Sequence, residues 1–403
     1  MLRFVIETQV QEFVLLLMVA AAVAILVKRL PIPYVTALAL VGAAAGLLPH
    51  PSAPTLTHSV ILFAILPGLL FEAGFNLRWN HLRHDLIAIG VLATFGVLLT
   101  TAAVAGLAVL VLGLSLPIAI LFGAMVAATD PVAVVALFRR LGIPGRLTTI
   151  LEAESLLNDG TGVVVFGIAL AAMTSGGMSG WKATEQFLQL TAGGVALGTG
   201  VGLVLSWLTA RLDDPQVEIT FTAIAAYGGY LLAEAVHVSG ILAVVAAAIV
   251  LGNYGRTHGM SQRTSAAVDT FWDYVAFLLN SAIFLLIGLS LPLGDVFSHV
   301  WLVVGAVAVV LAARAVIVYG TFGGMRLVHR GLPIRWQHLL VWGGLRGAIA
   351  VALLLSIPPS NLASLGSVPA LVYGIVLFNL VAQGISIGPL SSALLKEAHS
   401  SPA

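Results

Sequence analysis

Residues 154–162 read Glu-Ser-Leu-Leu-Asn-Asp-Gly-Thr-Gly and place two carboxylates, two hydroxyls and an amide inside an otherwise apolar stretch. Burying an ionised carboxylate without partners costs several kcal/mol, so such groups are rare inside membrane-spanning segments. Where they occur, they usually mark ion sites or proton relays. Asp159 is therefore the first candidate functional residue of this sequence, and the remaining chain must supply its surroundings.

The spacing of these groups predicts an oxygen-rich edge on one helix face. Ser155 and Asp159 are four residues apart, as are Glu154 and Asn158, so each pair shares a face of a helix. Hydroxyl and carboxylate oxygens suit a small alkali cation better than a transition metal. The sequence has no cysteine and no histidine cluster with zinc-binding spacing, and no cofactor is expected.

A buried carboxylate of this kind can hold either a cation or a proton. Burial disfavours its ionised form, whereas a bound cation favours that form, so the two ligands compete for Asp159. If the empty, charged site cannot cross the membrane interior, only loaded forms cross and competition becomes exchange. The structural alternative is that Asp159 is a helix polar group satisfied by a neighbouring side chain.

The composition is that of a polytopic, all-α membrane protein. Hydrophobic residues make up 60% of the chain and charged residues 9%, with a mean hydropathy of +1.07, against roughly 25% charged residues in a soluble domain. The net charge of +1, without any basic run, argues against a nucleic-acid partner. We predict about thirteen spanning helices of about 20 residues, near 10–27, 34–48, 59–77, 86–112, 116–138, 147–173, 187–208, 217–236, 239–251, 270–290, 296–322, 335–357 and 367–392. The second and ninth are short, as expected of tilted or partly re-entrant segments.

Basic residues predict the orientation of these helices, because positive residues collect in short connections on the cytoplasmic side. The odd-numbered connections and the tail contain Lys28, Arg29, Arg78, Arg83, Arg139, Arg140, Arg146, Arg211, Arg256, Arg263, Arg326, Arg330, Arg335 and Lys396. The even-numbered connections contain only Lys182. We therefore expect a multi-pass protein of the cell membrane with its N-terminus outside and its C-terminus in the cytoplasm.

Two of the predicted helices contain residues that interrupt helical structure. Thr-Asp-Pro at 129–131 lies near the centre of the fifth, and Gly-Gly-Leu-Arg-Gly at 343–347 near the centre of the twelfth. Proline removes a backbone donor and disfavours helix in the preceding residue, and clustered glycines weaken a helix. Interrupted helices in corresponding positions of two halves point to a transporter site. We expect helices one to six and eight to thirteen to form two inverted repeats, although glycine and proline are also common in ordinary membrane helices.

The interrupted helices bring further charges towards the candidate site. At helical rise, Asp159 lies roughly 20 Å along the sixth helix and Asp130 roughly 12 Å from the inner boundary, so the two carboxylates can approach each other. Asp130 can ligate a cation together with Thr129 and unwound carbonyl groups, or it can compensate the dipoles of half-helix N-termini; both interpretations stay open. Arg346 is expected to offset the negative ends of half-helices.

Two other membrane charges are expected to form a pair. Glu154 and Arg314 differ in depth by about 6 Å at helical rise, within reach of an arginine side chain, although depth alone leaves Arg346 as an alternative partner. Loss of one partner would leave an uncompensated charge, so the pair is interpreted as structural. Glu72, near the inner end of the third helix, has either a water-mediated site role or simple solvation. Asn280 is expected to hold neighbouring helices together.

Five sequence runs together resemble the monovalent cation/proton antiporters of the NhaP and mammalian sodium/proton exchanger branch. They are ATDPVAVVALF at 128–138, ESLLNDGTGVVVF at 154–166, HVSGILAVVAAAIVLG at 237–252, FLLNSAIFLLIGL at 277–289 and GGLRGAIAVAL at 343–353. The resemblance covers nearly the whole chain, and its most specific part is the Asn-Asp pair within ESLLND.

The resemblance implies a role for each candidate residue. The residues that match the family's ion site are Asp159, which carries the exchanged cation or proton, with Asp130, Ser155, the Thr129 backbone and, through water, Glu72. Asn158 stands where electrogenic relatives carry a second aspartate. The pair Glu154 and Arg314 stands where those relatives carry a membrane lysine. Similar proteins exchange one cation for one proton.

The resemblance also implies an NhaA-like antiporter fold that forms homodimers, in which a core domain moves against a dimer-forming panel. Within a single transporter domain, 1–403, the core helices would cover about 86–173 and 296–392, the panel helices about 10–77 and 217–290, and the linker helix about 187–208.

The sequence thus predicts a secondary antiporter rather than an enzyme, exchanging sodium, or lithium or potassium, for protons by alternating access. Its expected substrates are a monovalent cation and the proton, and it is expected to be embedded in the lipid bilayer. An intramembrane aspartyl protease also needs two membrane carboxylates, but the glycine-aspartate motif of those enzymes is missing from the predicted spans. A cation channel would need a filter or charged ring on a symmetric axis. Side-chain identity does not rank the three cations, because their selection depends on oxygen spacing.

Overall fold

The computed structural model describes residues 2–28, 32–48, 56–143, 145–326 and 331–396. Within these ranges the regular structure is helical, apart from one isolated β-bridge. The first part comprises α1 (Leu2–Val27), α2 (Tyr34–Gly46), η1 (Val60–Ile65), α3 (Leu66–Asn76), α4 (Trp79–Ala93), α5 (Phe95–Leu112), α6 (Leu116–Met125), α7 (Val132–Arg140), α8 (Gly145–Thr174) and α9 (Gly180–Thr209).

The second part continues with helices of the same kind. It comprises α10 (Pro215–Ala223), η2 (Ile224–Gly228), α11 (Gly229–Ala235), α12 (Gly240–Val250), η3 (Leu251–Gly255), α13 (Arg256–His258), α14 (Gln262–Leu289), α15 (Leu293–Ser298), α16 (Val300–Arg326), α17 (Ile334–Trp342), α18 (Ala348–Leu355), α19 (Pro359–Leu362), η4 (Ala363–Leu365), α20 (Val368–Phe378), η5 (Asn379–Gln383) and α21 (Gly384–Lys396).

Seven helices of the described chain are long and apolar enough to cross a membrane. They are Trp79–Leu112, Gly145–Thr174, Gly180–Thr209, Gly240–His258, Gln262–Leu289, Val300–Arg326 and Val368–Leu394. Shorter apolar helices and one pair bent by 103° add to them. The prediction of an all-α polytopic membrane protein is therefore confirmed, whereas the count of thirteen spans stays a prediction. The ninth predicted helix is longer than expected, because η3 and α13 continue α12 to His258.

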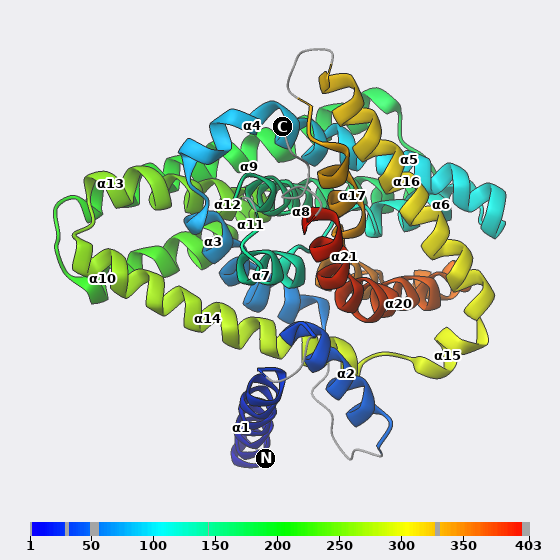
Figure 1. The fold of residues 1–403 in the computed structure, drawn as a ribbon, viewed down its shortest axis with the longest axis horizontal. Helices are drawn as coiled ribbons and strands as arrows, with labels where there is room; N and C mark the ends of the chain where they lie inside the picture. The colour runs from blue at the N-terminus through cyan, green and yellow to red at the C-terminus, as the bar shows by residue number, and fades with distance from the viewer. Residues whose placement is uncertain (1, 29–31, 49–55, 144, 327–330, 397–403) are drawn as a thin grey trace.

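Small residues allow several of these helices to pack closely. Gly194, Gly198 and Gly202 recur at every fourth residue of α9, and a Cβ atom at any of them would collide with α12, its N-cap or the residues of its last turn. Small-residue faces of this kind let membrane helices approach each other. In Figure 1, α9 lies beside α12, and α5, at the right of the view, contacts both α6 and α16.

Both predicted interruptions break their helices. The chain leaves helical geometry between the end of α6 at Met125 and the start of α7 at Val132, and again between the end of α17 at Trp342 and the start of α18 at Ala348. Pro131 cannot donate a backbone hydrogen bond and disfavours helix at the residue before it, which accounts for the first break.

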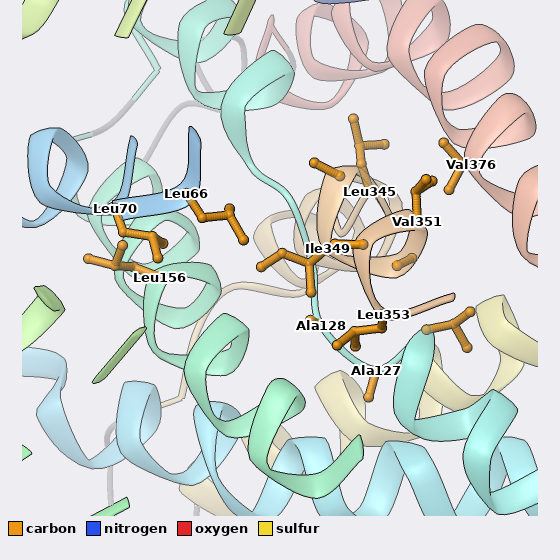
Figure 2. Close-up of a cluster of buried hydrophobic side chains, with 14 of the residues drawn as sticks. Leu66, Leu70, Ala127, Ala128, Leu156, Leu345, Ile349, Val351, Leu353 and Val376 are labelled. Atoms are coloured by element: carbon orange, nitrogen blue, oxygen red, sulfur yellow. The ribbon is translucent and has the colours of Figure 1, made fainter. Parts of the chain in front are cut away.

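Apolar side chains surround the two breaks. Leu66 and Leu70 of α3 lie opposite Leu156 of α8, and Ile349 of α18 lies near Ala128 (Figure 2). Leu66, Leu70 and Leu156 are each at most 4% exposed, so these side chains are almost fully shielded from the surroundings of the protein. The polar groups at the breaks are thus enclosed by hydrocarbon on several sides.

Basic residues gather at one end of the helices, which we call the basic face and define by Arg78, Arg139, Arg146 and Arg256. Arg78 and Arg139 line one surface depression together with Gly145, which precedes Arg146. Arg78 and Arg256 line a second cavity together. Of the basic residues used to predict orientation, Arg29 and Arg330 lie outside the described residues.

Candidate functional site

The two breaks meet each other in the middle of the molecule. The backbone N–H of Asp130 donates a hydrogen bond of 2.7 Å to the carbonyl oxygen of Leu345, which forms the isolated antiparallel bridge. Each interrupted segment therefore provides a hydrogen-bond partner for a backbone group of the other. This contact brings together residues that lie more than 200 positions apart in the sequence.

The carboxylate of Asp130 sits at the beginning of two half-helices. It accepts a hydrogen bond of 3.1 Å from the backbone N–H of Val132 in α7 and another from the backbone N–H of Ala348 in α18. Helix N-termini carry positive partial charge, so both contacts compensate the negative carboxylate. Gly347 makes this approach possible, because a Cβ atom there would collide with the carboxylate of Asp130.

Arg346 makes the opposite contacts. Its Nη1 donates to the carbonyl oxygens of Ala127 at 3.2 Å and Ala128 at 3.1 Å, just beyond the end of α6. These carbonyl groups have lost their helical partners, and a cation offsets the negative end of a half-helix. The side chain is almost completely buried, with 1% exposure of the residue.

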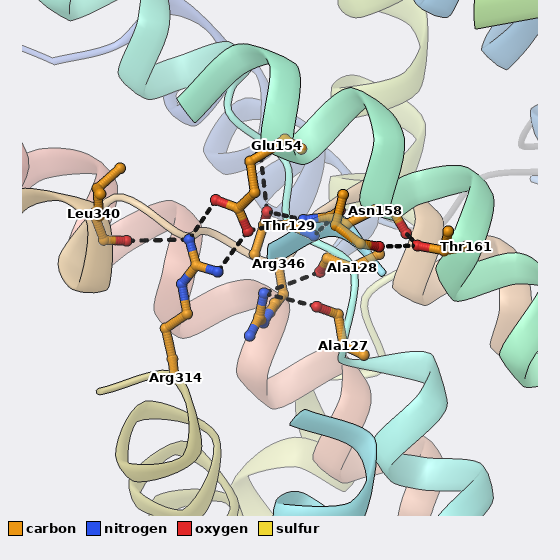
Figure 3. A network of polar contacts seen from close by, with 11 residues as sticks. Ala127, Ala128, Thr129, Glu154, Asn158, Thr161, Arg314, Leu340 and Arg346 are labelled. Atoms are coloured by element: carbon orange, nitrogen blue, oxygen red, sulfur yellow. Dashed lines mark hydrogen bonds and ion pairs between the residues drawn. The ribbon is translucent and has the colours of Figure 1, made fainter. Parts of the chain in front are cut away.

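Glu154 pairs with Arg314 rather than with Arg346. Arg314 Nη1 lies 2.6 Å from Glu154 Oε1, and Nη2 lies 2.8 Å from Oε2 (Figure 3). The side chain of Arg314 is 5% exposed and that of Glu154 is 1% exposed. Arg314 Nη2 also donates to the carbonyl oxygen of Leu340 at 3.4 Å, so the pair ties α8 and α16 to α17. Helix depth alone left Arg314 and Arg346 as alternative partners of Glu154, and the structure places Arg314 in contact with it.

A hydrogen-bonded cluster connects α8 to the first break. Asn158 Oδ1 accepts a hydrogen bond of 3.0 Å from the backbone N–H of Thr129, and Asn158 Nδ2 donates to the hydroxyl of Thr129 at 2.8 Å and to Glu154 at 3.2 Å. The hydroxyl groups of Thr129 and Ser155 are 2.8 Å apart. Asn158 thereby holds the unwound segment against the helix that carries Asp159.

The position of Ser155 differs from the sequence-based expectation of an oxygen edge shared with Asp159. Ser155 is fully buried and does not line the cavity described below, because its hydroxyl group is engaged with Thr129. The spacing of Ser155 and Asp159 showed that they share a helix face. It did not show that the first break, at Thr129, would cover that face at Ser155.

A cavity of about 200 Å³ lies beside the breaks and is lined by four of the predicted site residues: Asp159, Asp130, Thr129 and Glu72. Asp159 is partly exposed to it, and its carboxylate forms no hydrogen bond or ion pair with any other described residue. Asp130 faces the same cavity while it caps the two half-helices. The structural alternative, in which a neighbouring side chain satisfies Asp159, does not hold within the described chain.

The cavity extends towards the basic face. Arg139 and Glu152 line it there and form an ion pair of 2.9 Å, with the arginine side chain 57% exposed and the glutamate 15% exposed. Glu72 Oε1 accepts a hydrogen bond of 2.8 Å from Asn76. The negative charge near this end is therefore partly compensated.

Asn280 also lines the cavity, and sequence reasoning had assigned it only to helix packing. It projects from α14, and its Oδ1 is buried without a hydrogen-bond partner in the described structure. An uncharged amide in an apolar helix carries little signal by itself. Its position in the run at 277–289, among the runs that support the family resemblance, was the available indication.

The family of the chain follows from comparison with known proteins. Residues 14–393 match the family described as sodium/hydrogen exchanger, transmembrane. The chain belongs to this family. The resemblance inferred from the five sequence runs is confirmed, and the family consists of transporters rather than enzymes.

Named relatives of the exchanger family match over most of this chain. The low-affinity Na⁺/H⁺ antiporter NhaS1 of Synechocystis is 38% identical over 391 residues, covering 94% of this chain and 74% of that protein. The Na⁺/H⁺ antiporter NhaP of Pseudomonas aeruginosa is 38% identical over 347 residues, covering 82% and 80%.

A solved antiporter shares the fold of this family member. The structure of the sodium proton antiporter MjNhaP1 from Methanocaldococcus jannaschii at pH 8 superposes with a TM-score of 0.77 at 21% identity. The match covers 97% of this chain and 99% of the other.

Proposed function

We propose that this protein is a secondary antiporter that exchanges sodium ions for protons across a membrane, with Asp159 binding either ion in turn. The observation that carries the proposal is that Asp159 lines a cavity beside two broken helices and has no hydrogen-bond partner in the described chain. A carboxylate without protein partners in such a place can take a cation or a proton. The relatives named above are Na⁺/H⁺ antiporters, which supports the same substrates.

The exchange is one cation for one proton. The other buried charges near the site are compensated within the protein, since Glu154 pairs with Arg314 and Asp130 caps two half-helices. Asn158, next to Asp159, adds no charge. Asp159 is then the carboxylate whose charge alternates, so that one proton replaces one monovalent cation and no net charge moves.

The cation is held by oxygen atoms from both sides of the cavity. Asp159 supplies the charged ligand, Thr129 an oxygen from the unwound segment and Asn280 a neutral amide oxygen from α14. Asp130 acts through the half-helices that it caps, and Glu72 contributes through water. Ser155 positions Thr129 by the hydrogen bond between their hydroxyl groups. Lithium or potassium would compete for the same oxygen atoms.

Transport proceeds by alternating access of the site to the two sides of the membrane. The protein has about thirteen helices arranged as two inverted repeats. The paired breaks at α6–α7 and α17–α18 support this arrangement, because interrupted helices in two halves are typical of transporters with such repeats. In this proposal the core helices move against the panel helices of a homodimer. The basic face lies in the cytoplasm, so the protein crosses the cell membrane with its N-terminus outside and its C-terminus inside.

The test is sodium-dependent proton movement in liposomes that contain the purified protein and an internal pH dye. We expect sodium to dissipate an imposed pH gradient with the unchanged protein, and no dissipation with Asp159→Asn. Asp295→Asn, at an exposed residue of α15, is the matched control and should retain the activity. An unchanged rate with Asp159→Asn would refute the assignment, and a strong effect of membrane potential would refute the one-for-one exchange.

A further inference from the structure

A second cavity, of about 650 Å³, lies at the basic face away from Asp159. It is formed where the turn between α3 and α4 meets the end of the helix that runs through α12, η3 and α13. The candidate spans Trp79–Leu112 and Gly240–His258 begin and end here, respectively. The cavity therefore lies at the boundary of the membrane rather than at its centre.

The cavity wall offers unused hydrogen-bond donors and positive charge. Arg256 uses its two terminal nitrogens to bind Asp269, at 2.5 and 3.3 Å, but its Nε is buried and has no acceptor in the described structure. Arg78 is exposed, and its side chain has no hydrogen bond or ion pair with another described residue. Among described residues, no aspartate or glutamate lines the cavity. Since Asp269 balances Arg256, the surplus charge comes from Arg78.

The rim of the cavity has the character of a membrane interface. Trp79 and Tyr254 line it and are 49% and 50% exposed. Tryptophan and tyrosine are enriched at the level of lipid head groups, where an apolar ring meets a polar surface. The wall also contains the apolar residues Phe75, Ile249 and Val250, which suits the glycerol and acyl part of a lipid.

The walls are held in place without a ligand. Asn253 Nδ2 donates to the carbonyl oxygen of Leu77 at 2.8 Å, and its Oδ1 accepts from the backbone N–H of Trp79 at 2.7 Å. One side chain of η3 thus fixes the turn before α4. The first turn of α4 lines the cavity, and helix N-termini favour anions.

We propose that this cavity binds the phosphate-bearing head group of an anionic phospholipid, with Arg78 as the main contact to the phosphate and Arg256 beside it. Arginine matches the geometry of phosphate oxygens. Anionic lipids attract basic residues at this level of the membrane by about 1 kcal/mol per residue. The proposal does not depend on the ion specificity of Asp159.

The test measures the thermal stability of the full chain in neutral detergent during titration with phosphatidylglycerol, phosphatidylcholine of the same acyl chains, or inorganic phosphate. We expect phosphatidylglycerol to stabilise the protein more than phosphatidylcholine, and Arg78→Gln to weaken its apparent affinity about fivefold. Arg83→Gln changes an exposed arginine of α4 that does not line the cavity; it is the matched control and should bind as the unchanged protein does.

The outcomes separate the possible ligands. Equal stabilisation by the two lipids, or equal losses with Arg78→Gln and Arg83→Gln, would overturn the proposal. Full stabilisation by inorganic phosphate alone would overturn the assignment to a lipid. Because the exposed side chain of Arg78 makes no hydrogen bond or ion pair with another described residue, we expect Arg78→Gln to melt as the unchanged protein does without lipid. The double variant Arg256→Gln, Asp269→Asn removes the other contact without a net change in charge and should weaken binding as well.

Discussion

Removing one member of the Glu154–Arg314 pair should destabilise the protein much more than removing both. The two side chains are 1% and 5% exposed and share hydrogen bonds of 2.6 and 2.8 Å, so a single substitution leaves a buried, uncompensated charge. The cost of that state is about 3–5 kcal/mol. Arg314→Met and Glu154→Gln should each lose about this amount. The double variant should lose far less than either single variant, because neutral side chains of similar size replace the pair, so the coupling free energy should exceed the loss of either single variant.

The free energies can be compared by titrating the purified variants with SDS in mixed micelles and following tryptophan fluorescence. Trp272 is almost fully buried, and Trp342 is the last residue of α17, the helix in which Leu340 accepts a hydrogen bond from Arg314, so unfolding should change their emission. The reasoning fails if the double variant loses as much as the two single variants together. Additive losses would mean that each residue is stabilised by its other neighbours rather than by its partner.

Three further substitutions address the ion site. Asn280→Leu should raise the sodium concentration for half-maximal exchange about fivefold, as expected for the loss of one neutral oxygen ligand worth about 1 kcal/mol. An unchanged sodium dependence would show that Asn280 is not part of the site. Thr270→Ala, on the exposed side of α14, is the control. Gly347→Ala should abolish most exchange, because its methyl group would displace the Asp130 carboxylate. Gly320 has open space around it, so Gly320→Ala should transport normally. Equal rates of the two variants in liposomes would contradict the role of Gly347. Thr129→Val removes the hydroxyl that joins Ser155 to Asn158 and should lower stability by about 1–3 kcal/mol in the SDS titration, and full stability would show that the cluster does not hold the break.

Much of the fold could be predicted because a membrane imposes simple rules. Apolar stretches of spanning length, the helix-breaking residues at 129–131 and 343–347, and charges in apolar helices are all local features of the sequence. They were sufficient to predict the helical class and both breaks, whereas the family was indicated by the resemblance of the five sequence runs. The ninth helix was underestimated because η3 contains Gly252 and Asn253, which weaken the local signal, while contacts with α3 keep it helical.

The arrangement within the site could be predicted only in part. Depth along the helices placed Glu154 near two arginines, but the choice of Arg314 depends on how α8, α16 and α17 pack around each other. Asn280 is an uncharged residue, and only the fold shows that its amide oxygen lies unpartnered in the cavity that Asp159 lines.

The sequence by itself determined which residues are expensive to bury and where the helices must break, because the free energy of a charge in hydrocarbon and the backbone chemistry of proline and glycine are properties of the residues. The tertiary structure decided which of the buried charges are compensated. Asp130 meets the starts of α7 and α18, Arg346 meets the end of α6, and Glu154 meets Arg314. Asp159 is left without a partner in the described chain, since such contacts depend on the crossing of helices far apart in the sequence.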